Sequence, residues 1–253
     1  MDVKRIKEAA EGCLMEQVEL LKEFARVDCE SKDIEGNRRV VDIAKRVLSD
    51  IEGIEIKEDF FEGTGAHIER PEGKIVVNCH MDTVFPKGFA EKNPPFIDED
   101  NWLHGLGVGD CKGGFAVSAY AIKIASMLGL LPNKEIIMIY SCDEEIGSIT
   151  SSVVFEKEAQ GAECAFVFEG AVKTDKGYGI VTQRRGVILG ALDIKGVEAH
   201  AGGAYLQGHS AIKELAHKIL KYYSFNDYER EIYYNVAPIS GGRPNGVVAG
   251  DAH

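Results

Sequence analysis

The chain has 253 residues, and 45% of them are hydrophobic, so it can bury a substantial core as one large domain or two smaller ones. A formal net charge of −12 argues against nonspecific binding to nucleic acid or to an anionic membrane, since both need a basic face. The N-terminus is charged, and no apolar stretch approaches the ~20 residues of a membrane helix, so we expect a cytoplasmic protein. The 6 cysteines form no Cys-x-x-Cys pair, which favours buried thiols over disulfides or a zinc-thiolate site.

Two amphipathic helices, expected over about 4–25 and 38–48, open the chain. A third helix is expected over about 115–128, after a glycine-rich loop. Apolar or strand-like runs predict strands over 54–61, 74–79, 135–142 and 164–168. Such alternation indicates an α/β fold with a mixed, mainly parallel sheet and helices on both of its faces.

The pattern changes near residue 182, where we expect a second, smaller domain. Residues 186–196 alternate as a strand does, a helix is expected over 210–222, and a further strand is expected near 232–236. The predicted domains are therefore residues 1–181 and residues 182–253.

Metal-ligand side chains follow three of the predicted buried strands. His80 and Asp82 follow the first, the run Asp143-Glu144-Glu145 follows the second, and Glu169 follows the third. The carboxyl ends of parallel strands are where open α/β sheets place their ligand sites. Like charges gathered there demand a cation, because buried carboxylates that are not neutralised pay a heavy desolvation cost. Asp82 could fold back to orient the His80 ring.

Each motif alone has a plainer interpretation. A histidine two residues before an aspartate can be a surface pair, and Asp110, which the loop 105–114 delivers to the start of a helix, can be a helix N-cap. Glu144 and Glu145 can be solvated loop acids. On an extended backbone, however, adjacent residues point oppositely, so one can bind a metal while the other faces a water. The loop itself lacks the Gly-x-Gly-x-x-Gly interval of a nucleotide site.

Together these segments resemble the M20-type zinc metallopeptidase superfamily, which contains glutamate carboxypeptidase, succinyl-diaminopimelate desuccinylase, acetylornithine deacetylase, aminoacylase and peptidase T. The segments that carry the resemblance, in family order, are 80–84, 107–114, 143–148, 168–170, 185–202 and 241–248. The resemblance implies the N-terminal portion of a catalytic zinc-hydrolase domain over 1–181. It also implies part of an inserted α+β lid over 182–253, through which the chain would form a homodimer.

The resemblance further implies two zinc ions per site, for which cobalt or manganese can substitute. Asp110 would bridge the two ions, His80 and Glu169 would hold one, and Glu145 would hold the other. Glu144 would be the general base that takes a proton from a water bridging the metals.

Further roles follow from the same resemblance. Asp82 would orient His80, and His200, from the lid, would stabilise the reacting carbonyl oxygen. Arg243 and Asn245 would meet the substrate's carboxylate or the oxyanion. The expected reaction is hydrolysis of a peptide or N-acyl amide bond next to a free carboxylate, so small peptides and N-acyl amino acids are the expected substrates.

The alternative is a noncatalytic truncated fragment or binding module that keeps the fold. Family members continue to a late histidine ligand, and His253 stands where the lid should still be running. One ion would then keep only Asp110 and Glu145, fewer than the three protein ligands normal for catalytic zinc. We therefore expect the chain as given to hydrolyse its substrate weakly or not at all. A reading frame that continues beyond His253 to a late histidine would favour the enzyme, and a stop there would favour the noncatalytic fragment.

Overall fold

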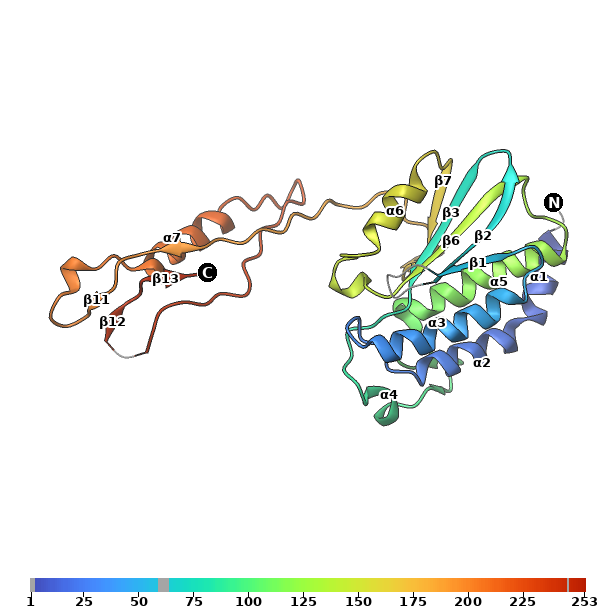
Figure 1. Cartoon of the computed structure of the whole chain (residues 1–253), viewed down its shortest axis with the longest axis horizontal. Helices are drawn as coiled ribbons and strands as arrows, with labels where there is room; N and C mark the ends of the chain where they lie inside the picture. Colours follow the sequence, from blue (N-terminus) through green and yellow to red (C-terminus); the bar gives the residue numbers. More distant parts are fainter. Residues whose placement is uncertain (1–2, 59–63, 245) are drawn as a thin grey trace. The chain divides into compact units, whose positions relative to one another are not determined.

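The computed structural model describes residues 3–58, 64–244 and 246–253 of the chain. It divides into two compact units, Met1–Val181 and Thr182–His253, and each is described by itself below. Figure 1 labels the main helices and strands.

Three helices open the first unit: α1 (Val3–Gly12), α2 (Leu14–Ala25) and α3 (Ile34–Ser49). The single helix predicted over 4–25 is thus two helices, with Cys13 between them. Helix α3 begins at Ile34, earlier than the start predicted at residue 38, because Asp33 caps it. The Asp33 carboxylate accepts a hydrogen bond from the Gly36 amide at 3.1 Å.

The sheet of this unit has the strand order β1-β2-β6-β3-β7. Its members are β1 (Glu55–Glu58), β2 (Thr64–Pro71), β3 (Lys74–His80), β6 (Lys134–Ser141) and β7 (Cys164–Val167). Strand β3 runs parallel to β6 and β7, whereas β2 runs antiparallel to β1 and β6. The shorter elements are α4 (Phe89–Lys92), β4 (Phe96–Ile97), β5 (Leu103–His104), β8 (Val172–Thr174) and β9 (Gly177–Gly179).

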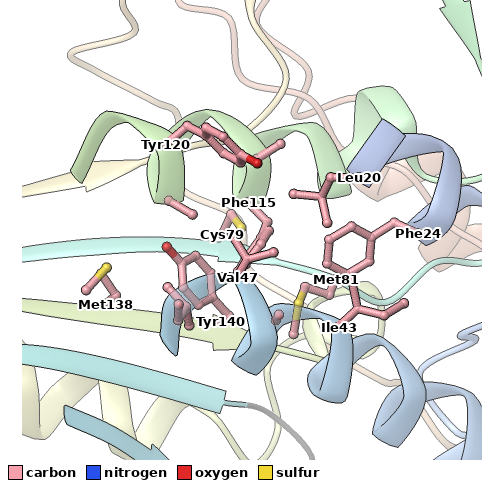
Figure 2. Close-up of a cluster of buried hydrophobic side chains, with 14 of the residues drawn as sticks. Leu20, Phe24, Ile43, Val47, Cys79, Met81, Phe115, Tyr120, Met138 and Tyr140 are labelled. Carbon is pink, nitrogen blue, oxygen red and sulfur yellow. The ribbon is translucent and has the colours of Figure 1, made fainter. Parts of the chain in front are cut away.

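Helices cover both faces of the sheet. Helices α2, α3 and α5 (Gly113–Met127) pack against one face of the sheet and form the larger core with it. In this core the Phe115 ring lies edge-on to the rings of Phe24 and Tyr140, at centroid distances of 5.3 and 4.6 Å (Figure 2). Such aromatic pairs add about 0.5–1.5 kcal/mol beyond their buried area. Helix α6 (Ser152–Ala159) packs on the other face, against Val76 and Ile137. The predicted mixed α/β fold with helices on both faces is therefore confirmed.

A buried lysine joins the start of α5 to the end of α2. The Lys112 side chain is fully buried, and its Nζ donates to the carbonyl oxygens of Phe24 at 2.9 Å and Val27 at 3.1 Å. The Phe24 carbonyl also accepts the Val27 amide at 3.1 Å, so the lysine chiefly satisfies the Val27 carbonyl, which lies just beyond the helix. The burial lowers the Lys112 pKa.

Replacing Lys112 with methionine should destabilise the protein. An unsatisfied buried acceptor costs about 1–3 kcal/mol, so we expect Lys112→Met to lower the free energy of unfolding by an amount in this range. Methionine also removes a buried charge, which offsets part of the loss. Urea unfolding measures the change, with Lys157→Met as the control, because the Lys157 side chain is 81% exposed. Equal stability of the two variants would contradict the prediction, since it would show that the Lys112 hydrogen bonds add nothing beyond the cost of burying the charge.

The second unit contains α7 (Ala211–Tyr223), as predicted, and two short strand pairs. Strand β10 (Ile194–Lys195) pairs with β13 (Asp251–Ala252), and β11 (Ala199–His200) pairs with β12 (Val247–Val248). The strands predicted over 186–196 and 232–236 are wrong, except for the two residues of β10. The rest of the first segment joins no ladder among the described residues, and its Val187, Ile188 and Leu189 are exposed. In the second segment Ile232 makes an isolated bridge with Asp227, so alternation alone did not suffice.

No helix in the described part of the chain is long and apolar enough to cross a membrane.

Candidate active site

The carboxyl ends of three parallel strands bring the predicted acids together. Strand β3 lies between β6 and β7, with His80 paired to Ser141 of β6 and Asn78 paired to Val167 of β7. The segments that follow each strand therefore start side by side at one edge of the sheet. The apolar runs of β3 and β6 are buried inside the sheet. The expectation that the third strand is buried too is wrong, because β7 is the edge strand of the sheet and its residues are exposed.

His80 is the centre of the cluster. Its Nε2 lies 2.9 Å from an Asp110 oxygen, 3.6 Å from a Glu169 oxygen and 3.9 Å from a Glu144 oxygen. The side chain of His80 is 2% exposed, whereas those of Asp110, Glu144 and Glu169 are 69%, 50% and 37% exposed. A buried imidazole thus faces acids that open to solvent.

The donor set fits a divalent metal ion. One ligand atom from each of His80, Asp110, Cys111 and Glu169 lies within 4.8 Å of the others. An imidazole nitrogen with carboxylate oxygens is a donor set suited to zinc, and also to cobalt or manganese. Without a cation, the carboxylates repel one another at short range.

Asp82 lies beneath the cluster and is completely buried. Its Oδ1 is 3.2 Å from His80 Nδ1 and accepts the Glu144 amide at 3.3 Å. Its Oδ2 accepts the Ser31 hydroxyl at 2.6 Å and the Glu145 amide at 3.2 Å. A single carboxylate therefore orients the His80 ring and also anchors the turn that carries the two glutamates.

Glu144 and Glu145 lie in a 3-10 turn, Glu144–Ile146, that follows β6. The expectation of an extended backbone for this pair is wrong. The reason is that both amides are drawn to the Asp82 carboxylate, which bends the chain directly after the strand.

Asp143, the first acid of the run, has a separate role. Its Oδ2 accepts the Thr150 amide at 2.8 Å, the Thr150 hydroxyl at 2.7 Å and the Ser151 amide at 2.9 Å. Burial raises the Asp143 pKa, but these hydrogen bonds outweigh it and lower the pKa. Asp143 thus closes the loop after β6, and the acid of this run that approaches His80 is Glu144, at 3.9 Å.

Asp110 is not the N-cap of α5, contrary to one interpretation of the sequence. Lys112 occupies that position, and it makes no capping hydrogen bond with its side chain. The Asp110 carboxylate instead reaches His80.

The loop that carries Asp110 is held against the end of β7. Cys111 is buried, and its thiol donates to the carbonyl oxygen of Phe168, the residue before Glu169, at an Sγ to oxygen distance of 2.7 Å. Gly114 makes this approach possible, since a Cβ there would lie 2.0 Å from the same oxygen. The spacing between Asp110 and Glu169 depends on this contact.

The charges of the cluster shift its pKa values. Burial lowers the pKa of His80, but the hydrogen bond to Asp82 and the surrounding negative charges raise it to about 10. Burial raises the pKa of Glu144, and the neighbouring acids raise it further. Burial and the charge of Asp110 raise the pKa of Glu145. Neighbouring negative charges contribute to all three pKa shifts, and a bound cation would neutralise that contribution.

Two predicted site residues belong to the second unit, and a third lies outside the described residues. His200 ends β11, and its Nδ1 accepts the amides of Gly202 and Gly203 at 3.1 and 3.0 Å. The Arg243 guanidinium pairs with Glu198 at 3.0 Å. Asn245 is the residue outside the described ranges.

His253 also belongs to the second unit. Its ring pairs with the Asp193 carboxylate, and its backbone pairs with Ser240.

The sequence analysis missed Ser31, which touches the site through Asp82. It lies 51 residues before Asp82, between two predicted helices. A serine is ordinary in such a loop, so the sequence holds no signal that would have singled it out.

In this α/β fold, the parallel strands end at a histidine and several acids. These side chains form the donor set of a metal-dependent hydrolase. Residues 76–245 match the model of peptidase family M20/M25/M40. The chain belongs to this family.

Two curated relatives are similar over most of this chain. Carboxypeptidase G2 of Pseudomonas sp. is 28% identical over 178 residues, which are 70% of this chain and 42% of that protein. Succinyl-diaminopimelate desuccinylase of Shewanella pealeana is 27% identical over 209 residues, 75% of this chain and 54% of that protein. The chain therefore spans about half the length of these relatives.

Solved structures share the fold. The aminopeptidase PepT from Bacillus cereus matches with a TM-score of 0.65 and 21% identity, over 93% of this chain and 64% of that one. The M20 family metallo-carboxypeptidase Sso-CP2 from Sulfolobus solfataricus matches with a TM-score of 0.61 and 16% identity, over 94% and 69%.

Proposed function

We propose that this protein hydrolyses a peptide or N-acyl amide bond next to a free carboxylate, as a carboxypeptidase, dipeptidase or deacylase. The observation that carries the proposal is the convergence of Asp110, Glu144 and Glu169 on one buried imidazole, His80. The names of its relatives, a carboxypeptidase and a desuccinylase, support the same class of reaction.

The proposed metal site holds two zinc ions, with cobalt or manganese as substitutes. His80, Asp110 and Glu169 would hold one ion, and Asp110 and Glu145 would hold the other. Bound divalent cations supply Lewis acidity, which polarises a carbonyl and lowers the pKa of a water molecule.

Glu144 is the proposed general base. Among the three acids around His80, its carboxylate is the farthest from the imidazole Nε2, at 3.9 Å. It takes a proton from the attacking water and then gives it to the leaving nitrogen. Asp82 accepts from Nδ1 of His80, which leaves Nε2 free to act as a ligand.

The proposed role of the second unit is that of a lid and dimerisation domain. Because two backbone amides donate to Nδ1 of His200, its ring proton belongs on Nε2. An Nε2 proton can be donated to a carbonyl oxygen as negative charge develops on it. Arg243 and Asn245 are the proposed partners of the substrate's carboxylate. We also propose a cytoplasmic location and a homodimer formed through this unit.

A matched pair of substrates tests the proposal. A zinc-loaded protein that spans the full length of its relatives should cleave N-acyl amino acids or dipeptides that end in a free carboxylate. It should cleave the corresponding carboxamides about 10-fold more slowly or worse, because a charge-assisted hydrogen bond is worth about 1.5–3 kcal/mol. Zinc binding without cleavage of any member of the panel would contradict the proposal and favour the noncatalytic binding module.

A further inference from the structure

A loop from the N-terminal helices reaches the metal-ligand cluster. Residues 26–33 connect α2 to α3, and the Thr83 amide donates to the Cys29 carbonyl of this loop at 2.9 Å. Glu30 also forms a bridge with Thr83. The Asn37 side chain, itself fully buried, donates to the carbonyl of Ser31 at 3.1 Å. The loop is thus fixed on both sides, beside the residues that follow His80.

Ser31 makes the shortest hydrogen bond to the Asp82 carboxylate. Its hydroxyl donates to Oδ2 at 2.6 Å, whereas the contacts to His80 Nδ1 and to the amides of Glu144 and Glu145 measure 3.2–3.3 Å. Ser31 is 4% exposed and Asp82 is 0% exposed, so water does not substitute readily for this donor. Ser31 reaches Asp82 from the loop before α3, whereas His80 ends β3 and the amides of Glu144 and Glu145 belong to the turn after β6.

The consequence of this contact follows from the geometry of a carboxylate. Rotation of the Asp82 carboxylate about its last bond moves both oxygens together, so a donor that fixes Oδ2 also fixes Oδ1. Oδ1 is the atom that faces His80 Nδ1 and accepts the Glu144 amide. A hydroxyl bonded to a charged oxygen is a strong, directional contact, whereas the two amide contacts are long.

We propose that Ser31 is a positioning residue of the metal centre, which acts by fixing the Asp82 carboxylate and, through it, the His80 ring and the Glu144–Glu145 turn. The inference rests on the proposed function, since it takes His80 as a metal ligand. Residues that support a ligating histidine typically contribute 10–100-fold to metal affinity. Because Ser31 acts through Asp82, we expect the low end of this range.

Zinc affinity tests the proposal. Ser31→Ala should raise the dissociation constant for zinc about 10-fold, measured by competition with a chelating dye. Ser31→Cys fills similar space with a weaker donor, so its dissociation constant for zinc should lie between those of the wild type and Ser31→Ala. Ser31→Thr restores the hydroxyl and should recover the affinity of the wild type. In the cobalt-loaded protein, the visible spectrum should change in Ser31→Ala, because the orientation of the imidazole ligand changes.

The matched control removes another buried hydroxyl. Ser118 on α5 is fully buried and donates to the Phe115 carbonyl at 3.0 Å, and its hydroxyl also lies 3.1 Å from that of Tyr140. Neither partner belongs to the metal-ligand cluster. Ser118→Ala should lower thermal stability and leave zinc affinity unchanged.

Three results would overturn the inference. Equal zinc affinity of wild type, Ser31→Ala and Ser31→Cys would remove Ser31 from the site and leave the proposed function standing. An equal loss of affinity in Ser118→Ala would show that Ser31 acts only through stability. Failure of the wild-type protein itself to bind zinc or cobalt would contradict the proposed function, and the inference would fall with it.

Discussion

In a protein that spans the full length of its relatives, Glu144→Gln should reduce the rate of amide hydrolysis at least ~100-fold while the metal content stays at the wild-type level, because general acid–base catalysis contributes ~10²–10⁴-fold. Glutamine keeps the size and the backbone hydrogen bond to Asp82 but cannot accept the proton from water. The measurement is kcat together with metal content from elemental analysis of the same sample.

Two control variants locate the effect at Glu144. Glu145→Gln should lose metal as well as activity, since its carboxylate is a proposed ligand. Glu156→Gln changes an exposed glutamate on α6 and should alter neither quantity. Loss of metal in Glu144→Gln would make Glu144 a ligand, and full activity in that variant would remove it from the reaction.

Gly114→Ala should weaken zinc binding more than 10-fold and also destabilise the protein. A Cβ at this position would lie 2.0 Å from the Phe168 carbonyl oxygen and 3.0 Å from Cys111 Sγ, so the start of α5 must move away from the end of β7. That movement separates Asp110 from Glu169. Overpacking of this kind typically costs about 1–3 kcal/mol of stability.

Gly109→Ala is the matched control on the same loop. A Cβ at Gly109 would meet nothing within 4 Å, and its backbone is not in the left-handed region. Zinc titration and thermal unfolding of both variants separate the two effects. If Gly114→Ala binds zinc as tightly as Gly109→Ala does, the contact with Phe168 does not set the spacing of the acids.

The strands that carry the site could be predicted, because their apolar runs are unbroken. Strands β3, β6 and β7 lie within a residue or so of the predicted ranges, and oxygens of Glu144 and Glu169, which follow β6 and β7, lie 3.9 and 3.6 Å from His80 at the end of β3. Strand β2, Thr64–Pro71, was not predicted. Its sequence, TGAHIERP, offers a glycine, a proline and charged residues instead of an apolar run.

The details of the site depend on contacts that no local pattern records. The turn at Glu144 forms because Asp82, 62 residues away, accepts its amide. Ser31 reaches the same carboxylate from a loop that precedes the sheet. Such long-range hydrogen bonds determine the geometry of the site without leaving a periodic signal in the sequence. The strand expected over 186–196 shows the converse: an alternating pattern is present there, but most of the segment has no neighbouring strand to pair with among the described residues.

The central claim is that the side chains at the ends of β3, β6 and β7 hold two divalent cations. Anomalous diffraction at the zinc edge, from crystals of protein loaded with zinc, tests it most directly. We expect two peaks, one bounded by His80, Asp110 and Glu169 and the other by Asp110 and Glu145. A map with no peak among these side chains after zinc loading would contradict the account.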